Sequence, residues 1–514
     1  MEGIITSSGL RWSRGRGVKS IQTGKGRRAL DEYKEEPLSP SARMFHEPNF
    51  NVHVIAVMGS FSAFNPQVIK DNLVHTLLKH PRFTTVPVVE EGGNMKWVAT
   101  KVDLDQHVVV PELGGGNFLL GGSSPDKFVE DYIYNLSKTS LSKAKPLWDL
   151  HLLNLKTSDA EAVAILRVHH SLGDGTSLIS LLLACTRQTA NPQLLPTVPT
   201  TKRRRPSAFS GGASPRFWTT YVVRLQHFML LLWHTLVDVF MFLATAAFLK
   251  DSNTPIKAAP GSHFNPRRVV FRTVSLDDFK LIKNAMDMTI NDVALGITQA
   301  GLSRYLNKRY CEVKNGNLGE MDKGNHLPNN IRLRSTLLIN LRPNAGIQAM
   351  AEMMENESEA KWGNWIGYVI LPFCIAQKDD PLDYLRDAKL TIDRKKHSLE
   401  ALYSFLIAKF VLKLFGIKVA GSLSHRIIEH TTMCFSNLVG PQEEIGFYGH
   451  PMAYLAPSSY GQPHGLMINF QSYVNKMTMV LSVDDSVIPN PHQLLDDLEM
   501  SLKIIKDVIV DKNY

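Results

Sequence analysis

Residues 162–185 read AVAILRVHHSLGDGTSLISLLLAC, and this stretch decides the class of fold. The run 162–168 is short and apolar, which predicts a buried strand. The run 176–185 has the length and the apolar content of a helix. Between the two runs, Gly173 and Gly175 permit a tight turn. The sequence therefore predicts a strand, a turn and a helix, which is the repeating unit of α/β proteins.

The turn carries a base and a carboxylate, His170 and Asp174, four residues apart at the end of the predicted strand. An imidazole with an unperturbed pKa near 6.5 is mostly neutral at cytosolic pH and can accept a proton. A hydroxyl group is a poor nucleophile until such a base accepts its proton. The pattern indicates His170 as a candidate general base, although a His-His pair in a loop, taken alone, is more often structural.

Strands and helices alternate on both sides of this stretch. Residues 51–58 predict a strand, and residues 65–78 predict a helix that begins at an asparagine followed by a first-turn proline. This first half ends near residue 191. A second α/β half follows, with a helix that begins at Ser275 and carries early acidic residues. Its predicted strands cover residues 269–274, 336–341, 365–373, 453–455 and 476–483, and a closing helix covers 491–510.

A linker and an apolar segment separate the two halves. Residues 192–215 are rich in Pro, Thr, Ser and Gly and include the basic run 202–205, which predicts a linker. Residues 228–249 are nearly all apolar and long enough to span a bilayer. Asp238 costs about 3 kcal/mol on insertion scales, and about a dozen apolar residues at about 0.3 to 0.6 kcal/mol each more than offset it. The alternatives are an interfacial helix or a buried core helix, because His234 and Asp238 share a face and are expected to form a polar contact.

A second segment, residues 405–415, places Lys409 and Lys413 four apart on an otherwise apolar surface. This pattern is typical of a helix that lies at a membrane interface. A core helix with two snorkelling lysines is the alternative.

The composition restricts the class of partner. The formal charge is +9, but the basic residues gather near residues 11–28 and 202–205 and form no nucleic-acid motif, so we expect a membrane surface and no nucleic acid. Residues 1–36 predict a disordered basic tail without a signal peptide, and an organelle transit peptide is the alternative. The cysteines are far apart without zinc-binding spacing, so we expect reduced thiols and no metal. They are Cys185, Cys311, Cys374 and Cys434.

The string HHxxxDG at residues 169–175 resembles the signature of the wax ester synthase/diacylglycerol acyltransferase family, which lies within the CoA-dependent acyltransferase superfamily. Five further blocks look like family blocks: Pro146-Leu147-Trp148, Asn291-Asp292-Val293, Asn340-Leu341-Arg342-Pro343, Trp362-Gly363-Asn364 and Ser436-Asn437-Leu438-Val439-Gly440-Pro441. The last is similar to the pattern SNVxGP, with Leu438 at the usual valine position. The resemblance covers nearly all of residues 37–510 and is strongest to the plant branch.

This resemblance implies an α/β fold of two chloramphenicol-acetyltransferase-like subdomains, with a hydrophobic membrane-associated segment between them. Residues 37–191 would form the N-terminal subdomain with HHxxxDG, and residues 263–514 the C-terminal subdomain. Residues 192–262 would hold the basic linker and the membrane helix at 228–249. His170 would lie in a tunnel between the subdomains, where CoA and the acceptor enter from opposite sides.

The resemblance also implies roles for the site residues. His170 would be the general base, and Asp174 would orient the turn through a salt bridge. His169 would be a supporting catalytic residue or would hold the loop by a hydrogen bond. The residues expected to contact substrate are Gly173, Gly175, Asn291, Asp292, Ser436 and Asn437. Of these, Asn291 and Asp292 either line the acyl-CoA channel or cap a helix, and Ser436 and Asn437 are candidate donors to an oxyanion.

The implied reaction moves a long-chain fatty acyl group from the co-substrate acyl-CoA to a long-chain alcohol, to diacylglycerol, or to both, without a further cofactor. The expected location is the endoplasmic reticulum membrane, facing the cytosol, and the plasma membrane is the alternative. Two other functions stay open: transfer to a soluble hydroxyl or amine acceptor, and a non-catalytic membrane lipid-binding protein. The first would carry a C-terminal DFGWG block, which this sequence lacks. The intact His170 and Asp174 argue against the second.

Overall fold

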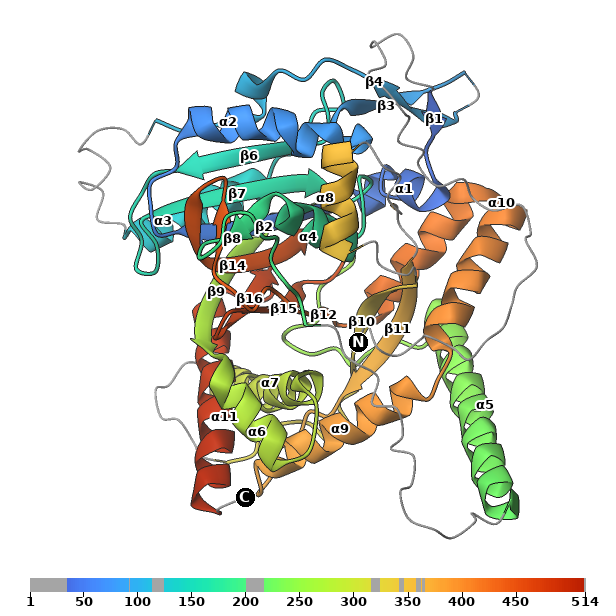
Figure 1. Ribbon diagram of the computed structural model, residues 1–514. Coiled ribbons are helices and arrows are strands. Elements are labelled where there is room, and N and C mark those ends of the chain that lie inside the picture. Colours follow the sequence, from blue (N-terminus) through green and yellow to red (C-terminus); the bar gives the residue numbers. More distant parts are fainter. Residues whose placement is uncertain are drawn as a thin grey trace.

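Two large sheets form the body of the molecule and a small sheet lies beside them (Figure 1). The computed structural model describes residues 35–91, 93–112, 124–199, 217–315, 324–341, 346–356, 362 and 366–512. The predicted basic tail, up to residue 34, and the basic run 202–205 lie outside these residues. The small sheet has the order β1-β4-β3, with β1 at Glu36–Pro37, β3 at Thr85–Val89 and β4 at Met95–Ala99.

The first large sheet has seven strands in the order β5-β6-β7-β2-β14-β13-β8. Their bounds are β2 His53–Ser60, β5 Val108–Val109, β6 Trp148–Leu153, β7 Ala162–His169, β8 Thr186–Gln188, β13 Ile445–Phe447 and β14 His450–Tyr460. The helices of this part are α1 Pro40–Met44, α2 Pro66–His75, α3 Pro125–Ser137, α4 Gly175–Ala184 and α8 Gly346–Asn356. The predicted strand 162–168 and the predicted start of α2 are confirmed, and the Asn65 side chain accepts hydrogen bonds from the amides of Gln67 and Val68.

The second large sheet has six strands in the order β11-β10-β12-β15-β16-β9. Their bounds are β9 Arg268–Ser275, β10 Leu333–Asn340, β11 Ile366–Phe373, β12 Met433–Leu438, β15 Leu466–Tyr473 and β16 Lys476–Val483. Helices α6 Leu276–Ala285, α7 Ile290–Asn315, α9 Leu382–Lys396 and α11 Pro491–Asp511 pack with it. The predicted cap is confirmed, because the Ser275 side chain accepts from the Asp277 amide.

The two sheets do not divide the chain at the predicted boundary. Residues 263–514 were expected to form the second subdomain alone, but β13 and β14 lie in the first sheet, where β14 pairs antiparallel with β2. Helix α8 also packs on α4. The physical reason is burial: β2 has β7 on one side and β14 on the other, so its backbone groups are paired on both edges. The first subdomain is therefore completed by a later part of the chain.

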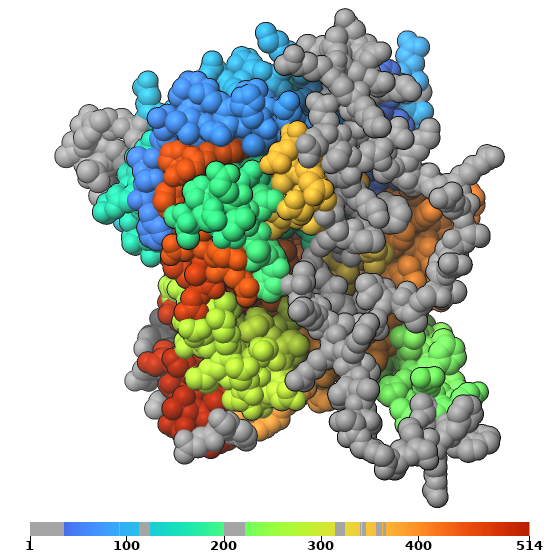
Figure 2. Space-filling model, in the orientation of Figure 1, coloured from blue at the N-terminus to red at the C-terminus, as the bar shows by residue number. Residues whose placement is uncertain are grey.

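Helix α5, Phe217–Ala247, includes most of the predicted apolar segment and projects from the body (Figures 1 and 2). Among the described residues, its part Tyr221–Ala247 is long and apolar enough to cross a membrane, and 28% of its most apolar stretch is buried. Residues 221–230 are exposed, whereas Asp238 and Phe242 are buried against the body. The helix thus combines a free apolar end with a docked end.

The docked part of α5 corrects one expectation from the sequence. Asp238 was expected to contact His234, but it accepts hydrogen bonds from Lys395 at 2.9 Å and from Arg394. Both partners come from the end of α9, and Lys395 also donates to Glu400 at 2.7 Å. Cationic partners compensate the buried carboxylate far better than a neutral ring does.

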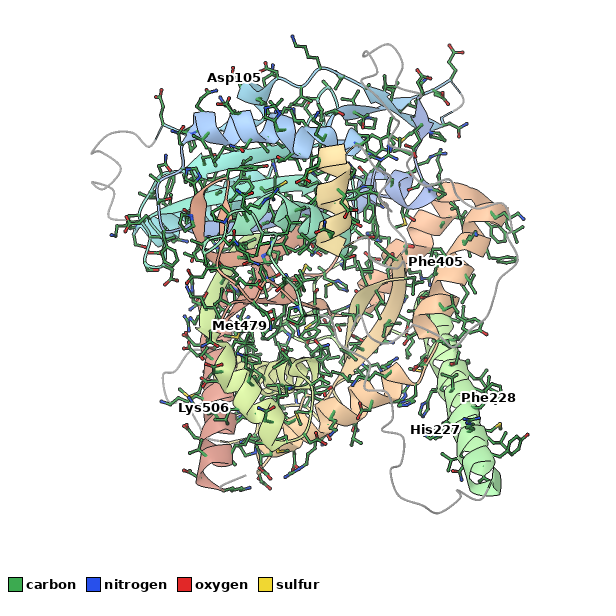
Figure 3. All side chains as sticks on the ribbon, viewed as in Figure 1. Asp105, His227, Phe228, Phe405, Met479 and Lys506 are labelled. Atoms are coloured by element: carbon green, nitrogen blue, oxygen red, sulfur yellow. The ribbon has the colours of Figure 1, made fainter. Side chains whose placement is uncertain are left out.

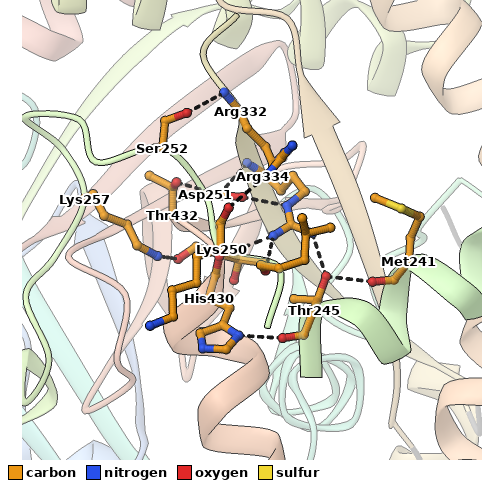
Figure 4. Close-up of polar contacts among 12 residues, drawn as sticks. Met241, Thr245, Lys250, Asp251, Ser252, Lys257, Arg332, Arg334, His430 and Thr432 are labelled. Atoms are coloured by element: carbon orange, nitrogen blue, oxygen red, sulfur yellow. Dashed lines mark hydrogen bonds and ion pairs between the residues drawn. The ribbon is translucent and has the colours of Figure 1, made fainter. Parts of the chain in front are cut away.

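A polar network anchors the last turn of α5 (Figure 4). Arg334 on β10 donates to the Thr245 hydroxyl at 2.6 Å, to Asp251 at 2.6 Å and to the Leu249 carbonyl at 2.9 Å. His430 donates from Nδ1 to the Thr245 carbonyl at 2.5 Å. These bonds satisfy carbonyl groups that a helix end leaves unpaired, and they fix α5 to the second sheet.

Helix α10, Glu400–His430, is broken at Gly416 and forms two limbs, residues 400–415 and 417–430. Gly416 has φ 78° and ψ −179°, a backbone region that only glycine adopts readily. The predicted amphipathic segment 405–415 is the end of the first limb.

Candidate active site

His170 follows directly after the last residue of β7, and β7 lies between β2 and β6 in the first sheet. A buried ion pair supports this strand, because Arg167 donates to both carboxylate oxygens of Asp149, at 3.0 Å and 2.5 Å. The two residues face each other across β7 and β6. The strand that presents His170 is therefore held at its end by charge as well as by sheet pairing.

The His170 imidazole is buried, with 8% exposure, and stacks on the Phe45 ring at a centroid distance of 4.3 Å. Its backbone amide donates to the Val52 carbonyl at 2.9 Å. Burial lowers the pKa of His170 below its ordinary value of 6.5, and the negative charge of Asp174 opposes part of this shift. The ring is therefore neutral at neutral pH, which is the form a general base needs.

Asp174 fixes the turn as the N-cap of α4. Its side chain accepts from the Ser177 amide at 2.9 Å and from the Thr176 hydroxyl at 3.0 Å. Capping orients the turn by satisfying an amide that the helix start leaves unpaired. The salt bridge expected for Asp174 stays a prediction.

The two glycines of the turn have different surroundings. A Cβ atom at Gly173 would lie 2.7 Å from the Trp362 ring, and the indole of Trp362 donates to the Leu172 carbonyl at 2.5 Å. Gly173 is thus needed for close packing of the turn. Gly175 has room for a Cβ atom, and its backbone lines the cavity described below.

His169 is occupied by its neighbours. Its Nε2 donates to the Asn51 side-chain carbonyl at 3.0 Å, and its Nδ1 accepts from the Ser171 hydroxyl at 2.7 Å. Its ring also stacks on His46 at 4.7 Å and is absent from the cavity wall among the described residues. This geometry favours the role of holding the loop by hydrogen bonds over a direct part in catalysis.

His170 lines a cavity of about 1060 Å³. Parts of both sheets line it, including His170, Trp148 and Leu178 from the first sheet and its helices, and Ser436 and Asn469 from the second sheet. Its wall is mostly apolar, and polar side chains gather where β12, β14 and β15 approach. These polar side chains are Ser436, Ser458, Ser459, Gln462, His464 and Asn469. The cavity therefore offers a large, mostly apolar space that His170 and polar side chains of the second sheet share.

Only part of the expected substrate-contacting set reaches this cavity. Ser436 lines it, but Asn437 instead donates to the Asn291 side-chain carbonyl at 2.5 Å, so these two residues tie β12 to the start of α7. Asp292 accepts from the Thr289 amide at 2.7 Å, and the Thr289 hydroxyl accepts from the Asp292 amide at 3.3 Å. This reciprocal pair is a capping box, the structural alternative considered for Asp292.

Sequence reasoning missed Phe45, Asn469 and the contribution of α10 to the cavity. Phe45 lies just after the short helix α1, where no periodic pattern marks it. Asn469 is the partner of Ser436 in the pairing of β12 and β15. Only knowledge of that strand pairing would have brought the two residues together.

Two family models match the chain. The wax ester synthase/diacylglycerol acyltransferase catalytic domain matches residues 53–294, and the WS/DGAT C-terminal domain matches residues 362–506. The wax ester synthase/diacylglycerol acyltransferase 6 of Arabidopsis thaliana is 50% identical over 494 residues, which cover 93% of this chain and 95% of the relative.

Two solved structures share the fold. The wax ester synthase/diacylglycerol acyltransferase from Marinobacter aquaeolei VT8 has a TM-score of 0.53 at 16% identity, over 92% of this chain and 99% of that chain. The first condensation domain of the CDA synthetase has a TM-score of 0.51 at 11% identity, over 89% and 91%. These likenesses confirm the predicted α/β fold of two chloramphenicol-acetyltransferase-like subdomains.

Proposed function

The chain belongs to the wax ester synthase/diacylglycerol acyltransferase family, and on this premise we propose that it acylates long-chain alcohols, diacylglycerol or both from acyl-CoA, with His170 as the general base. The observation that carries the proposal is the place of His170. It is a buried, neutral imidazole at the wall of a large apolar cavity that both sheets line.

The reaction needs one base and one oxyanion site. Neutral His170 accepts the proton of the acceptor hydroxyl while the hydroxyl oxygen attacks the thioester carbonyl. The tetrahedral intermediate then collapses, the carbon–sulfur bond breaks, and the CoA thiolate takes the proton from His170. Ser436, which lines the same cavity from the second sheet, is our candidate donor to the oxyanion, and Phe45 stacks on the imidazole and holds its plane.

The membrane is the proposed source of the acceptor, and we place the protein at the cytosolic face of the endoplasmic reticulum, with the plasma membrane as the alternative. Support comes from α5, whose residues 221–230 are exposed and mostly apolar (Figure 3). Because α5 is docked on the body from Asp238 onward, only its first part is free to contact lipid, and we favour a helix that lies at the interface over one that spans the bilayer. Recovery of the activity in the membrane pellet, rather than in the soluble fraction, tests this placement.

The test of the reaction compares microsomes that contain wild-type protein with microsomes that contain His170→Ala. Labelled palmitoyl-CoA is offered with hexadecanol or diacylglycerol, and the neutral lipids are resolved. We expect wax ester or triacylglycerol from the wild type and a loss of about 10² to 10⁴-fold in the variant, the usual contribution of a general base. An unchanged product would remove His170 as the base, and no product from either acceptor would favour a soluble acceptor or a binding function.

A further inference from the structure

The two limbs of α10 separate the cavity from the surface of the molecule by the thickness of one helix. The inner faces of the limbs line the cavity through Phe405, Ala408, Leu412, Ile417 and Ser424. Figure 3 places Phe405 on α10, and α10 lies along one edge of the body in Figure 1. One face of this helix lines the cavity and the other face is uncovered. The helix is therefore the boundary between the cavity and the outside of the molecule.

The two limbs of α10 form a helical hairpin, the α10 hairpin. Its outer face is apolar and positively charged. Its exposed apolar side chains are Leu406, Phe410, Leu414, Phe415 and Val419, with exposures from 46% to 61%. Its exposed lysines are Lys413 and Lys418, and no acidic residue occurs between residues 401 and 428. Lys409 is also exposed, but it lines the cavity as well. Apolar side chains among lysines match the interface of a bilayer that contains anionic lipid, because the rings enter the headgroup region while the ammonium groups meet the phosphates.

Gly416 lies at the bend between the two limbs, and this bend, with Phe415 beside it, is the tip of the hairpin. The positive φ of 78° at Gly416 bends the chain sharply between the two limbs, which lie beside each other in Figure 1, so Phe415 lies at the bend. A Cβ atom at Gly416 would meet nothing within 4 Å, so packing does not require glycine there and backbone conformation does. The hairpin is also held from inside, because α1 packs against α10 and Met44 lies near Gly421.

We propose that the α10 hairpin is a lipid portal: its tip enters the headgroup region, and the apolar acceptor passes from the bilayer into the cavity along the inner faces of the limbs. An acceptor with a long alkyl chain then never crosses water on its way to His170, which avoids the free energy of exposing apolar surface. This inference rests on the proposed function and adds the element through which the acceptor enters.

The test separates presentation of the acceptor from chemistry. The full-length double variant Phe410→Ser and Phe415→Ser changes two exposed side chains that do not line the cavity, and Leu390→Ser, at a 70% exposed position on α9, is the matched control. Each protein receives palmitoyl-CoA with one of two acceptors. One is hexadecanol in vesicles of phosphatidylcholine and phosphatidylserine, and the other is hexanol in solution.

We expect the tip variant to lose about tenfold or more of the rate on hexadecanol in vesicles and to keep its rate on hexanol, while the control keeps both rates. A tip variant that keeps the vesicle rate overturns the portal alone. Equal loss with both acceptors also overturns it, because the hairpin would then be structural. Diacylglycerol in the same vesicles is a third acceptor for the wild type. A wild type that turns over neither alcohol and makes no triacylglycerol overturns the proposed function and the portal with it.

Discussion

Two effects act in opposite directions on the protonation of His170. Burial lowers the pKa of the imidazole below 6.5, and the carboxylate of Asp174 raises it. Because the base must be neutral, activity falls as the pH drops through the pKa of His170 and is flat above it.

Replacing Asp174 by Asn separates its charge from its cap. Asn caps a helix about as well as Asp, so the turn keeps its hydrogen bonds, but the charge that raises the pKa of His170 is lost. We expect the acid limb of the pH–rate profile to move to lower pH than in the wild type. Asp174→Ala loses the charge and the cap, so we also expect it to lower the free energy of unfolding by about 1 kcal/mol. An acid limb that stays in place or moves to higher pH would contradict this account.

The sequence predicts the chemistry of these residues better than their neighbours. His170 and Asp174 follow from one local motif, because both lie in the same turn. Phe45 and the Asn291–Asn437 pair do not, because partners in such contacts are far apart in sequence, 146 residues in the second case. The blocks of this chain that resemble the family therefore include residues with a structural role as well as residues that line the cavity.

Helix α5 shows, at the scale of an element, that the sequence does not predict partners that are far apart along the chain. Its apolar run predicts a helix, but the sequence does not give the partners of Asp238, which lie 156 and 157 residues further along the chain. The buried group of Asp238, Lys395 and Glu400 decides that one side of α5 packs on protein. Burial raises the pKa of Glu400 to about 7, which reflects how fully this group is removed from water.

Asp238→Ala should therefore release α5 from the body. It leaves the buried Lys395 with one carboxylate fewer, and removing a partner from a buried pair lowers the free energy of unfolding by about 3 to 5 kcal/mol. Lys396→Ala, which breaks a surface pair with Asp393, is the matched control and should cost less than about 1 kcal/mol. Urea unfolding followed by tryptophan fluorescence measures both variants. Equal effects would show that the buried group does not hold the helix.

At the scale of the whole molecule, the linear boundaries read from composition do not match the three-dimensional parts. The strands β7, β9 and β16 and the closing helix α11 lie where the sequence predicts them. The return of β13 and β14 to the first sheet has no local signal, because strand pairing across the chain depends on which edge is free.

This return predicts that the first part of the chain cannot fold alone. A fragment of residues 1–191 would lack β14, which exposes one edge of β2 and the buried side chains Ile55 and Val57. We expect this fragment to be insoluble when expressed alone, and soluble and active when co-expressed with residues 192–514. Soluble, cooperatively unfolding protein from residues 1–191 alone would contradict the prediction.

Strand β14 also limits how the enzyme moves. It pairs with β2 in the first sheet, packs against β15 and β16 of the second, and contributes Ser458 and Ser459 to the cavity wall. Strand β14 thus connects the two halves, and we expect no hinge opening between them. We therefore expect the passage of long acyl and acceptor chains into and out of the cavity, rather than domain closure, to limit the rate of each catalytic cycle.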